Sequence, residues 1–336
     1  MSKTVRSGAT WLFGALCVAA CATSDGSGGT PTEGADAPTS RASDGATSGS
    51  DISQTGTTDG ADPLSAEGAD ATTGGPSGCE ANIPPAPTGP VAPPPVTDEN
   101  APTGSVAGRL VRPGGQPIEG LRMLVCTAAI CYWDDTDSDG RFLVTALTLE
   151  PLKMQTGDPN GAHLDLVFYH SLETTEISEL PGHVTVPLRE GEAVPWSDEG
   201  GTVTLADGQL VLDAAAGALT YPFGTLQEAV RAMRIEGTDL PPYDWAPWEG
   251  REEETFAFVV NPVGIEAEPS VTVRVHGVSD APCSVYRIWS VTSKSGGLTY
   301  AGTATVVDTD DGLALVSDPD ATIEGLTTLI FTPLEN

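Results

Sequence analysis

A run of spaced aspartates could bind calcium. The run is Asp135-x-Asp137-x-Asp139-Gly140, which has the carboxylate spacing that opens a helix–loop–helix calcium site. That kind of site closes with a bidentate Glu at its twelfth position, where this chain has Ala146. We therefore predict a hairpin turn, in which Gly140 has a positive φ and the aspartates accept backbone hydrogen bonds. A looser calcium site, with Asp135, Asp137 and Asp139 as ligands, is the alternative; no cofactor is expected.

A proline-broken segment, residues 240–248, carries three aromatic side chains beside two carboxylates. The aromatic residues are Tyr243, Trp245 and Trp248, and the carboxylates are Asp244 and Glu249. Aromatic faces next to polar groups suit the recognition of a glycan or a peptide. We favour the alternative, a long loop whose aromatic rings fill the bottom of the second β-domain, with one Trp buried and the other partly exposed.

Four cysteines remain after those of the N-terminal segment, an even number that suits an oxidising compartment. Cys126 and Cys131 are close enough in the chain for a strand that bends back on itself, so we predict a disulfide between them. Cys79 and Cys283 either pair with each other, which would tie the linker to the second domain, or remain free.

No pattern of a known catalytic site occurs in the chain. The four histidines, at positions 163, 170, 183 and 276, lie in or beside alternating segments and have no metal-ligand spacing. We therefore expect a non-enzymatic protein without catalytic residues. A hydrolase acting on envelope polymers is the alternative, and it would need a nucleophile or an acid–base pair in a pocket.

The N-terminus has the features of a secretory signal over residues 1–20. Lys3 and Arg6 precede an apolar stretch that is too short to span a bilayer. The stretch ends in Val18-Ala19-Ala20-Cys21, which resembles the lipobox of bacterial lipoproteins. That resemblance implies lipid attachment at Cys21 and a membrane partner reached through the acyl chains. Ala22, in place of an Asp, favours the outer membrane over the inner one.

Residues 21–102 predict a disordered tether that carries the lipidated Cys. Its composition is almost entirely Gly, Ser, Thr, Ala, Asp and Pro, which cannot bury enough apolar surface to order the chain. Within it, residues 83–95 (IPPAPTGPVAPPP) predict a stiff polyproline II spacer. A proline-rich recognition motif is the alternative for this stretch.

Charge excludes one class of partner. The chain has 47 acidic and 15 basic residues and a formal charge of −32, which repels nucleic acid. No apolar run reaches the length of a transmembrane helix.

Beyond residue 102, alternating apolar and polar residues predict many short strands, and hence two all-β sandwich domains, 103–190 and 191–336. Asp207-Gly208 between two alternating runs predicts a two-residue hairpin turn. Residues 225–234 are the one helical candidate, because Leu226, Val230 and Met233 fall at i, i+4 and i+7.

The first of these domains resembles the carboxypeptidase regulatory-like family, a transthyretin-like β-sandwich. Three pieces carry the resemblance, in the family's order: residues 104–111 (GSVAGRLV), residues 115–121 (GQPIEGL) and residues 136–142 (TDSDGRF). The resemblance implies about seven strands and a non-catalytic accessory or binding role. Residues 216–225 (AGALTYPFGT) resemble, more weakly, the ZU5-like β-domains of bacterial surface proteins.

These features together predict a lipid-anchored envelope protein that displays β-sandwich modules for binding or for envelope structure. A calcium-stabilised structural module and the hydrolase are the two other functions that remain open.

Overall fold

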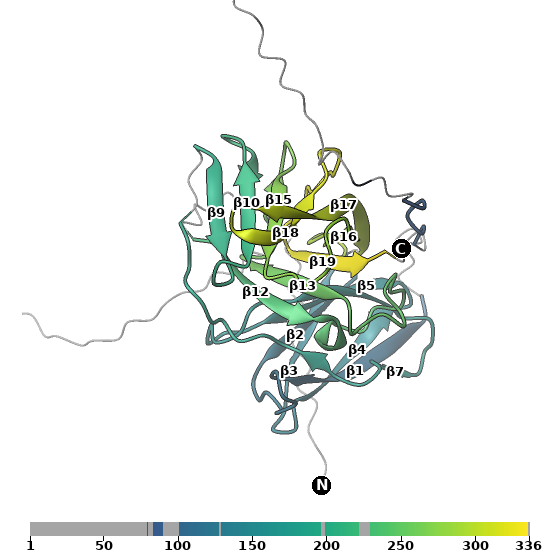
Figure 1. Ribbon diagram of the computed structural model, residues 1–336. Coiled ribbons are helices and arrows are strands. Elements are labelled where there is room, and N and C mark those ends of the chain that lie inside the picture. The colour runs from purple at the N-terminus through teal and green to yellow at the C-terminus, as the bar shows by residue number, and fades with distance from the viewer. Residues whose placement is uncertain are drawn as a thin grey trace, which may run out of the picture. The chain divides into compact units, whose positions relative to one another are not determined.

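A computed structural model describes residues 79, 83–89, 101–127, 129–195, 199–221 and 229–334 (Figure 1). All of them belong to one compact unit, Gly74–Asn336. The predicted signal peptide, Cys21 and most of the predicted tether lie outside the described residues. In the described part the regular elements are strands and a single 3-10 turn, Gly237–Asp239, so the all-β prediction is confirmed. No helix in this part is long and apolar enough to cross a membrane.

The first domain consists of two sheets packed face to face. One sheet has the order β4-β1-β7, with β8 also pairing with β1, and the other has the order β3-β2-β5-β6. The strands are β1 (Thr103–Val111), β2 (Arg122–Cys126), β3 (Cys131–Asp135), β4 (Arg141–Thr148), β5 (Pro151–Gly157), β6 (Val167–Ser171), β7 (Ile177–Glu179) and β8 (Val184–Thr185). Their buried faces alternate residue by residue, as in β5, where Leu152, Met154 and Thr156 are buried.

The aspartate run forms the hairpin turn that its sequence predicts. Gly140 has φ +74°, and a Cβ at this position would lie 2.4 Å from the carbonyl oxygen of Leu110. Asp137 Oδ1 accepts hydrogen bonds from the backbone N–H groups of Asp139 and Arg141, each at 3.0 Å. The turn thereby returns Phe142 to the core.

The second domain is built on one nine-stranded sheet, of order β12-β13-β19-β16-β17-β18-β15-β10-β9. Its strands are β9 (Gly201–Leu205), β10 (Leu210–Ala214), β12 (Arg231–Glu236), β13 (Phe256–Asn261), β15 (Thr272–His276), β16 (Val285–Val291), β17 (Leu298–Thr309), β18 (Gly312–Ser317) and β19 (Thr328–Pro333). A two-stranded ladder joins β11 (Leu219–Thr220) to β14 (Glu266–Ala267). The sheet curls until its first and last strands, β12 and β9, are in contact, so that it is nearly closed like a barrel.

Both faces of this sheet are buried along β13. Phe256, Phe258 and Val260 point into the curled interior, whereas Ala257 and Val259 join the core of the first domain. All six residues of β13 are buried, because the strand lies between two apolar clusters.

The predicted Asp207-Gly208 hairpin is present, but its turn is longer than two residues. Leu205 pairs with Leu210, which leaves four residues in the loop. Ala206 and Asp207 have positive φ values of 50° and 53°, and Gly208 has 89°. Because the side chains of β9 and β10 still face one core, the register that the alternation predicts is retained.

The prediction of a helix over residues 225–234 is wrong for the part of this range that the structure describes. Residues 231–236 form β12, which pairs antiparallel with β13, and residues 225–228 lie outside the described part. Ala232 faces the curled interior and Ile235 faces the first domain. This strand is buried on both faces, so its apolar residues follow no strict alternation, and long-range pairing decides its conformation.

The proline-rich stretch is not a free spacer over residues 83–89. Arg287 Nη2 donates hydrogen bonds to the carbonyl oxygens of Pro84 and Pro85, at 3.1 and 3.2 Å. A disulfide joins Cys79 to Cys283, so the chain is fastened to the second domain ahead of this stretch. Residues 90–95 of the predicted spacer lie outside the described residues.

Candidate functional site

The aromatic segment 240–248 lies at the junction of the two domains. Trp248, only 3% exposed, belongs to the apolar cluster that contains Phe168 of the first domain. The Tyr243 ring makes edge-to-face contacts with Phe168 and Trp248, with ring centroids 6.3 and 5.5 Å apart. These rings therefore fill the junction between the domains, and not the bottom of the second domain as the sequence suggested.

Trp245 differs from Trp248 because it is partly exposed, so the expectation of one buried and one partly exposed Trp is confirmed. Its ring meets that of Trp289 edge to face, at a centroid distance of 5.7 Å. It forms one wall of a pocket of about 240 Å³ between the domains. The pocket walls include the aromatic residues Tyr169, Tyr243 and Trp245 and the hydroxyl residues Thr292, Ser295 and Thr299.

The chemistry of this pocket is aromatic and neutral. No charged side chain lines it among the described residues. Tyr243 keeps its proton, because burial raises the pKa of its hydroxyl well above the usual range. Tyr169 exchanges a hydrogen bond with Ser171, with their oxygens 2.9 Å apart, which holds its ring at the rim. Rings next to hydroxyls can stack on a flat face of a ligand and hydrogen-bond to its edge.

Asp244, from the same segment, meets His170 of β6. The distance from His170 Nδ1 to Asp244 Oδ1 is 2.8 Å, and that from His170 Nε2 to Ser178 Oγ is 3.1 Å. The second carboxylate oxygen of Asp244 accepts a short hydrogen bond from the backbone N–H of Ser171. His170 is buried, and it links β6 of one sheet, β7 of the other sheet and the aromatic segment. His170 thus lies between a carboxylate and a serine hydroxyl, which is also the hydrogen-bonding arrangement of a hydrolase triad.

A second polar contact crosses the domain junction at Asp165. Its backbone N–H donates to Asn261 Oδ1 at 3.1 Å, and Asn261 Nδ2 donates to its carbonyl oxygen at 3.2 Å. Burial raises the pKa of the Asp165 carboxyl to about 6, although the nearby positive charge of Arg189 opposes the shift. The folded protein therefore binds this proton more tightly than an exposed aspartate would, and ionising Asp165 at neutral pH costs stability.

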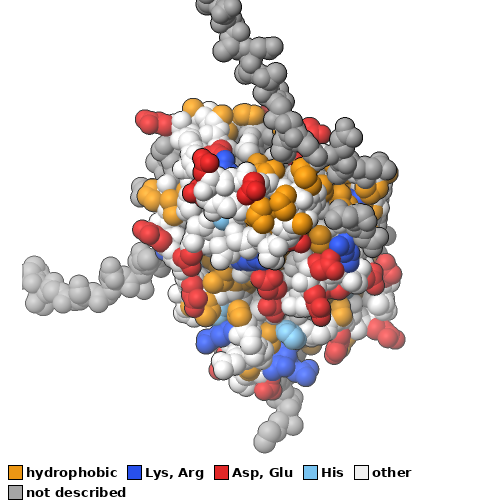
Figure 2. Space-filling view, in the orientation of Figure 1, with side chains coloured by type: hydrophobic (Ala, Val, Ile, Leu, Met, Phe, Trp, Pro, Cys, Tyr) orange, Lys and Arg blue, Asp and Glu red, His pale blue; other side chains and the backbone are white. Residues whose placement is uncertain are grey.

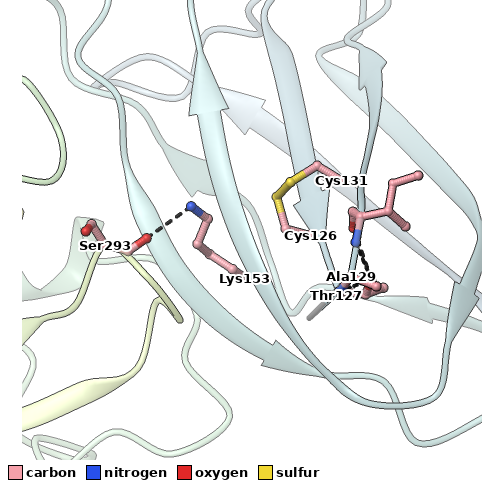
Figure 3. Close-up of a disulfide and its surroundings, with 7 residues drawn as sticks. Cys126, Thr127, Ala129, Cys131, Lys153 and Ser293 are labelled. Carbon is pink, nitrogen blue, oxygen red and sulfur yellow. Dashed lines mark hydrogen bonds between the residues drawn. A yellow bond between two sulfur atoms is a disulfide. The ribbon is translucent and has the colours of Figure 1, made fainter. Parts of the chain in front are cut away.

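The disulfide predicted between Cys126 and Cys131 is confirmed (Figure 3). The two residues are register partners where β2 turns into β3. Beside them, Lys153 of β5 donates from Nζ to the carbonyl oxygen of Ser293, 3.0 Å away in the second domain (Figure 3). Burial lowers the pKa of Lys153, so this contact holds a cation at a desolvated position. The Cys79–Cys283 disulfide, which the sequence left open, is also present.

The aspartates of the candidate calcium loop are engaged within the hairpin. The Asp135 carboxylate pairs with the Arg122 guanidinium, with Nε 2.9 Å from Oδ1. The backbone carbonyl of Asp139 accepts a hydrogen bond from Arg109 Nε. Within the part of the chain that the structure describes, no group of three or more His, Cys, Asp or Glu side chains is placed to hold a metal ion.

The pocket contains residues that sequence reasoning missed. Tyr169 lies in β6, which looked like a plain strand. Thr292 and Ser295 come from the turn between β16 and β17, and Thr299 lies in β17 itself. The turn is held against β6: a Cβ at Gly296 would lie 2.2 Å from the carbonyl oxygen of Phe168. Sequence separation of more than 120 residues hides this contact, although Ser293-Lys294-Ser295-Gly296-Gly297 does mark a turn.

Comparisons with known proteins leave the family open. No family model matches the chain, and no curated protein matches it. Three solved structures overlap with it at TM-scores of 0.15 to 0.23, which are too low to define a shared fold. A DUF3823 family protein from Parabacteroides merdae is 12% identical, over 70% of this chain and 100% of that one. The Bacillus anthracis TIE protein is 8% identical, over 70% and 48%, and a Ca²⁺-stabilised, ice-binding adhesin of an Antarctic bacterium is 10% identical, over 67% and 73%.

Replacing Asp165 with Asn is expected to stabilise the protein at neutral pH. The folded pKa of about 6 lies above the unfolded value of about 3.9, so the folded state binds the proton more tightly. The stability due to this proton is fully present below about pH 4 and is lost as the pH rises through 6. Asp165→Asn removes that loss, so the variant should gain up to about 3 kcal/mol over wild type at pH 7 and nothing at pH 4.

Urea unfolding at pH 4, 5, 6 and 7 measures this effect. Asp310→Asn, at an exposed position in the turn between β17 and β18, is the matched control for the loss of one carboxylate. A constant difference between Asp165→Asn and wild type at all four pH values would contradict the prediction.

Proposed function

We propose that the chain is a lipid-anchored envelope protein whose folded part binds a neutral glycan in the aromatic pocket. The observation that carries this proposal is the position of Trp245: its ring is partly exposed, is backed by Trp289, and faces a pocket with hydroxyls on its other wall. A buried ring would contribute only to the fold, whereas a half-exposed ring in a pocket is available to a ligand.

The chemistry of the pocket favours an uncharged sugar over other small ligands. A sugar ring has an apolar face for Trp245 and hydroxyl edges for Thr292, Ser295 and Thr299. Figure 2 shows acidic side chains spread over one face of the molecule, and the formal charge of the chain is −32. This field repels anions, so a neutral ligand suits it best.

The resemblance of the first domain to the carboxypeptidase regulatory-like family supports a non-catalytic role. Residues 104–111 lie in β1, residues 115–121 form the following turn, and residues 136–142 form the hairpin that leads into β4, an order compatible with the resemblance. Membership in that family, and a ZU5-like origin for the part of the second domain near β11, are parts of the proposal.

Attachment to the membrane through Cys21 is the part of the proposal that explains the N-terminal region. A lipobox before a long stretch of small polar residues suits a protein that is displayed at a distance from the bilayer. Two or three acyl chains hold a protein far more firmly than one, because each buried CH₂ contributes about 0.8 kcal/mol. Ala22 favours the outer membrane as the site of display.

Trp245→Ala should weaken binding to a neutral oligosaccharide by about tenfold or more. The melting temperature should change little, because the ring is partly exposed. Trp248→Ala should instead destabilise the protein by about 3–5 kcal/mol, through lost burial and a cavity. A glycan array identifies the ligand, and calorimetric titration then measures its affinity for each variant.

Trp133→Ala is the matched control for this experiment. Trp133 is 61% exposed on β3 and does not line the pocket. Equal losses of glycan binding in the Trp133 and Trp245 variants, or no neutral glycan bound by the wild-type chain, would reject the proposed function.

Cys21→Ser should abolish the incorporation of radiolabelled palmitate and move the protein from the membrane to the soluble fraction. The Cys21 sulfur is the atom that would carry the diacylglycerol, and serine has no sulfur with which to form the thioether. Cys17→Ser, in the segment that the signal peptidase would remove, is the control and should leave labelling intact. Labelling that persists in the Cys21 variant would exclude this anchor.

A serine hydrolase is a second candidate function, favoured by the arrangement of Ser178, His170 and Asp244. His170 lies within hydrogen-bonding distance of both the serine hydroxyl and the carboxylate, as a general base requires. Ser178→Ala should then abolish labelling of the full chain by a fluorophosphonate probe, and Ser171→Ala should not. Absence of labelling in the wild-type chain would leave His170 with the structural role of joining the two sheets to the aromatic segment.

A further inference from the structure

The described part of the proline-rich stretch, residues 83–89 (IPPAPTG), makes a set of specific contacts with the second domain. Ala86 packs against the apolar cluster of the domain junction, and Gly89 lies on the ring of Trp245. A Cβ at Gly89 would lie 2.9 Å from Trp245 Cζ3, so only glycine fits here without a shift. Ile83 and the remaining residues of the segment are exposed.

The two inward positions of this segment are three residues apart, although Ile83, three residues earlier, is exposed. Ala86 and Gly89 are the two half-buried positions, and the residues between them are exposed. Three residues per turn is the period of the polyproline II helix, which presents every third residue to the same side. The inward positions carry small residues, which bring the backbone close to the aromatic surface.

The surface beneath the segment has the two parts that polyproline recognition requires. Arg287 of β16 donates from Nη2 to two successive carbonyl oxygens, those of Pro84 and Pro85. The aromatic part is the partly exposed ring of Trp245, which lies against Gly89 and is backed by the buried ring of Trp289. A polyproline II helix has no internal hydrogen bonds, so its carbonyl groups are free to accept bonds from a cation.

We propose that this surface of Arg287 and Trp245 is a docking groove for proline-rich peptides, and that residues 83–89 fill it in the resting protein. Its ligand in trans is an extended peptide with two adjacent prolines, a small residue and, three positions later, a glycine. The groove shares Trp245 with the proposed sugar pocket, which Gly89 also lines, whereas Arg287 belongs to the groove alone.

The Cys79–Cys283 disulfide explains how a short segment with few contacts keeps the groove filled. The Cys79–Cys283 disulfide closes the chain just ahead of residues 83–89 and holds them at a high local concentration beside the groove. The contacts themselves use only backbone carbonyls and small side chains, which any peptide of the same pattern presents. A free peptide can therefore occupy the groove once the chain's own segment is displaced.

The experiment opens the groove within the full-length chain. Cys79→Ser and Cys283→Ser remove the link, and Gly89→Val places a side chain against the Trp245 ring. The probe is a fluorescent peptide with the sequence of residues 82–90 (NIPPAPTGP), followed by anisotropy. We expect it to bind the opened chain at least about tenfold more tightly than it binds the wild-type chain. The matched control carries Thr88→Val with both cysteines in place, because Thr88 faces solvent and the segment of this linked chain should stay docked.

Two further measurements test the contacts. Arg287→Ala in the opened chain should weaken peptide binding about tenfold, because two charge-assisted hydrogen bonds are lost. The same peptide with valine in place of its glycine should also bind about tenfold more weakly. Because Arg287 does not line the aromatic pocket, glycan binding should be retained in Arg287→Ala, which separates this proposal from the proposed function.

Equal peptide binding by the wild-type, control and opened chains would overturn the proposal, as would no binding by an opened chain that melts like wild type. If Gly89→Val prevents folding, Pro84→Gly with Pro85→Gly in the unlinked chain opens the groove without a clash, because flexible residues make docking more costly in entropy. That chain must then bind the peptide more tightly than wild type. Gel filtration shows whether the opened chains instead exchange segments and dimerise, which would identify a second copy as the source of the peptide.

Discussion

Burial of the outer face of the curled sheet is the constraint on which the rest of the structure depends. Ala257, Val259 and Ile330 would face water if the second domain stood alone, and they instead complete the core of the first domain. The hydrophobic contribution scales with the apolar area removed from water, so this shared core fixes the two domains as one unit. The predicted boundary near residue 190 therefore separates two stretches of sequence whose side chains share one core.

The shared core also determines which polar groups are buried. Asn261, His170 and Lys153 lie at its margin, and each has a hydrogen-bond partner on the other domain. A buried polar group without a partner costs more than its hydrogen bond contributes, so such contacts select one arrangement of the two domains. Asp165 also lies at this margin, and its ionisation costs stability because burial raises its pKa to about 6.

The two proposed binding surfaces follow from the same junction. Closing it brings β6 of one domain against the turn between β16 and β17 of the other, and the aromatic pocket is the space that remains between them. Trp245 belongs to both surfaces: one side of its ring faces the pocket, and Gly89 of the proline-rich segment rests on it. The fold thus holds a rigid aromatic side chain where it is neither buried nor free to move.

The sequence alone determined the fold class, the hairpin at Gly140 and the Cys126–Cys131 disulfide, because each depends on local alternation or turn chemistry. It predicted that one Trp is buried and the other partly exposed, but packing in the shared core decided that Trp248 is the buried one. Only the tertiary structure decided that β12 is a strand, that residues 83–89 are docked, and that His170 meets Asp244. These contacts join residues that are far apart in the chain, and strands buried on both faces carry no alternation to reveal them.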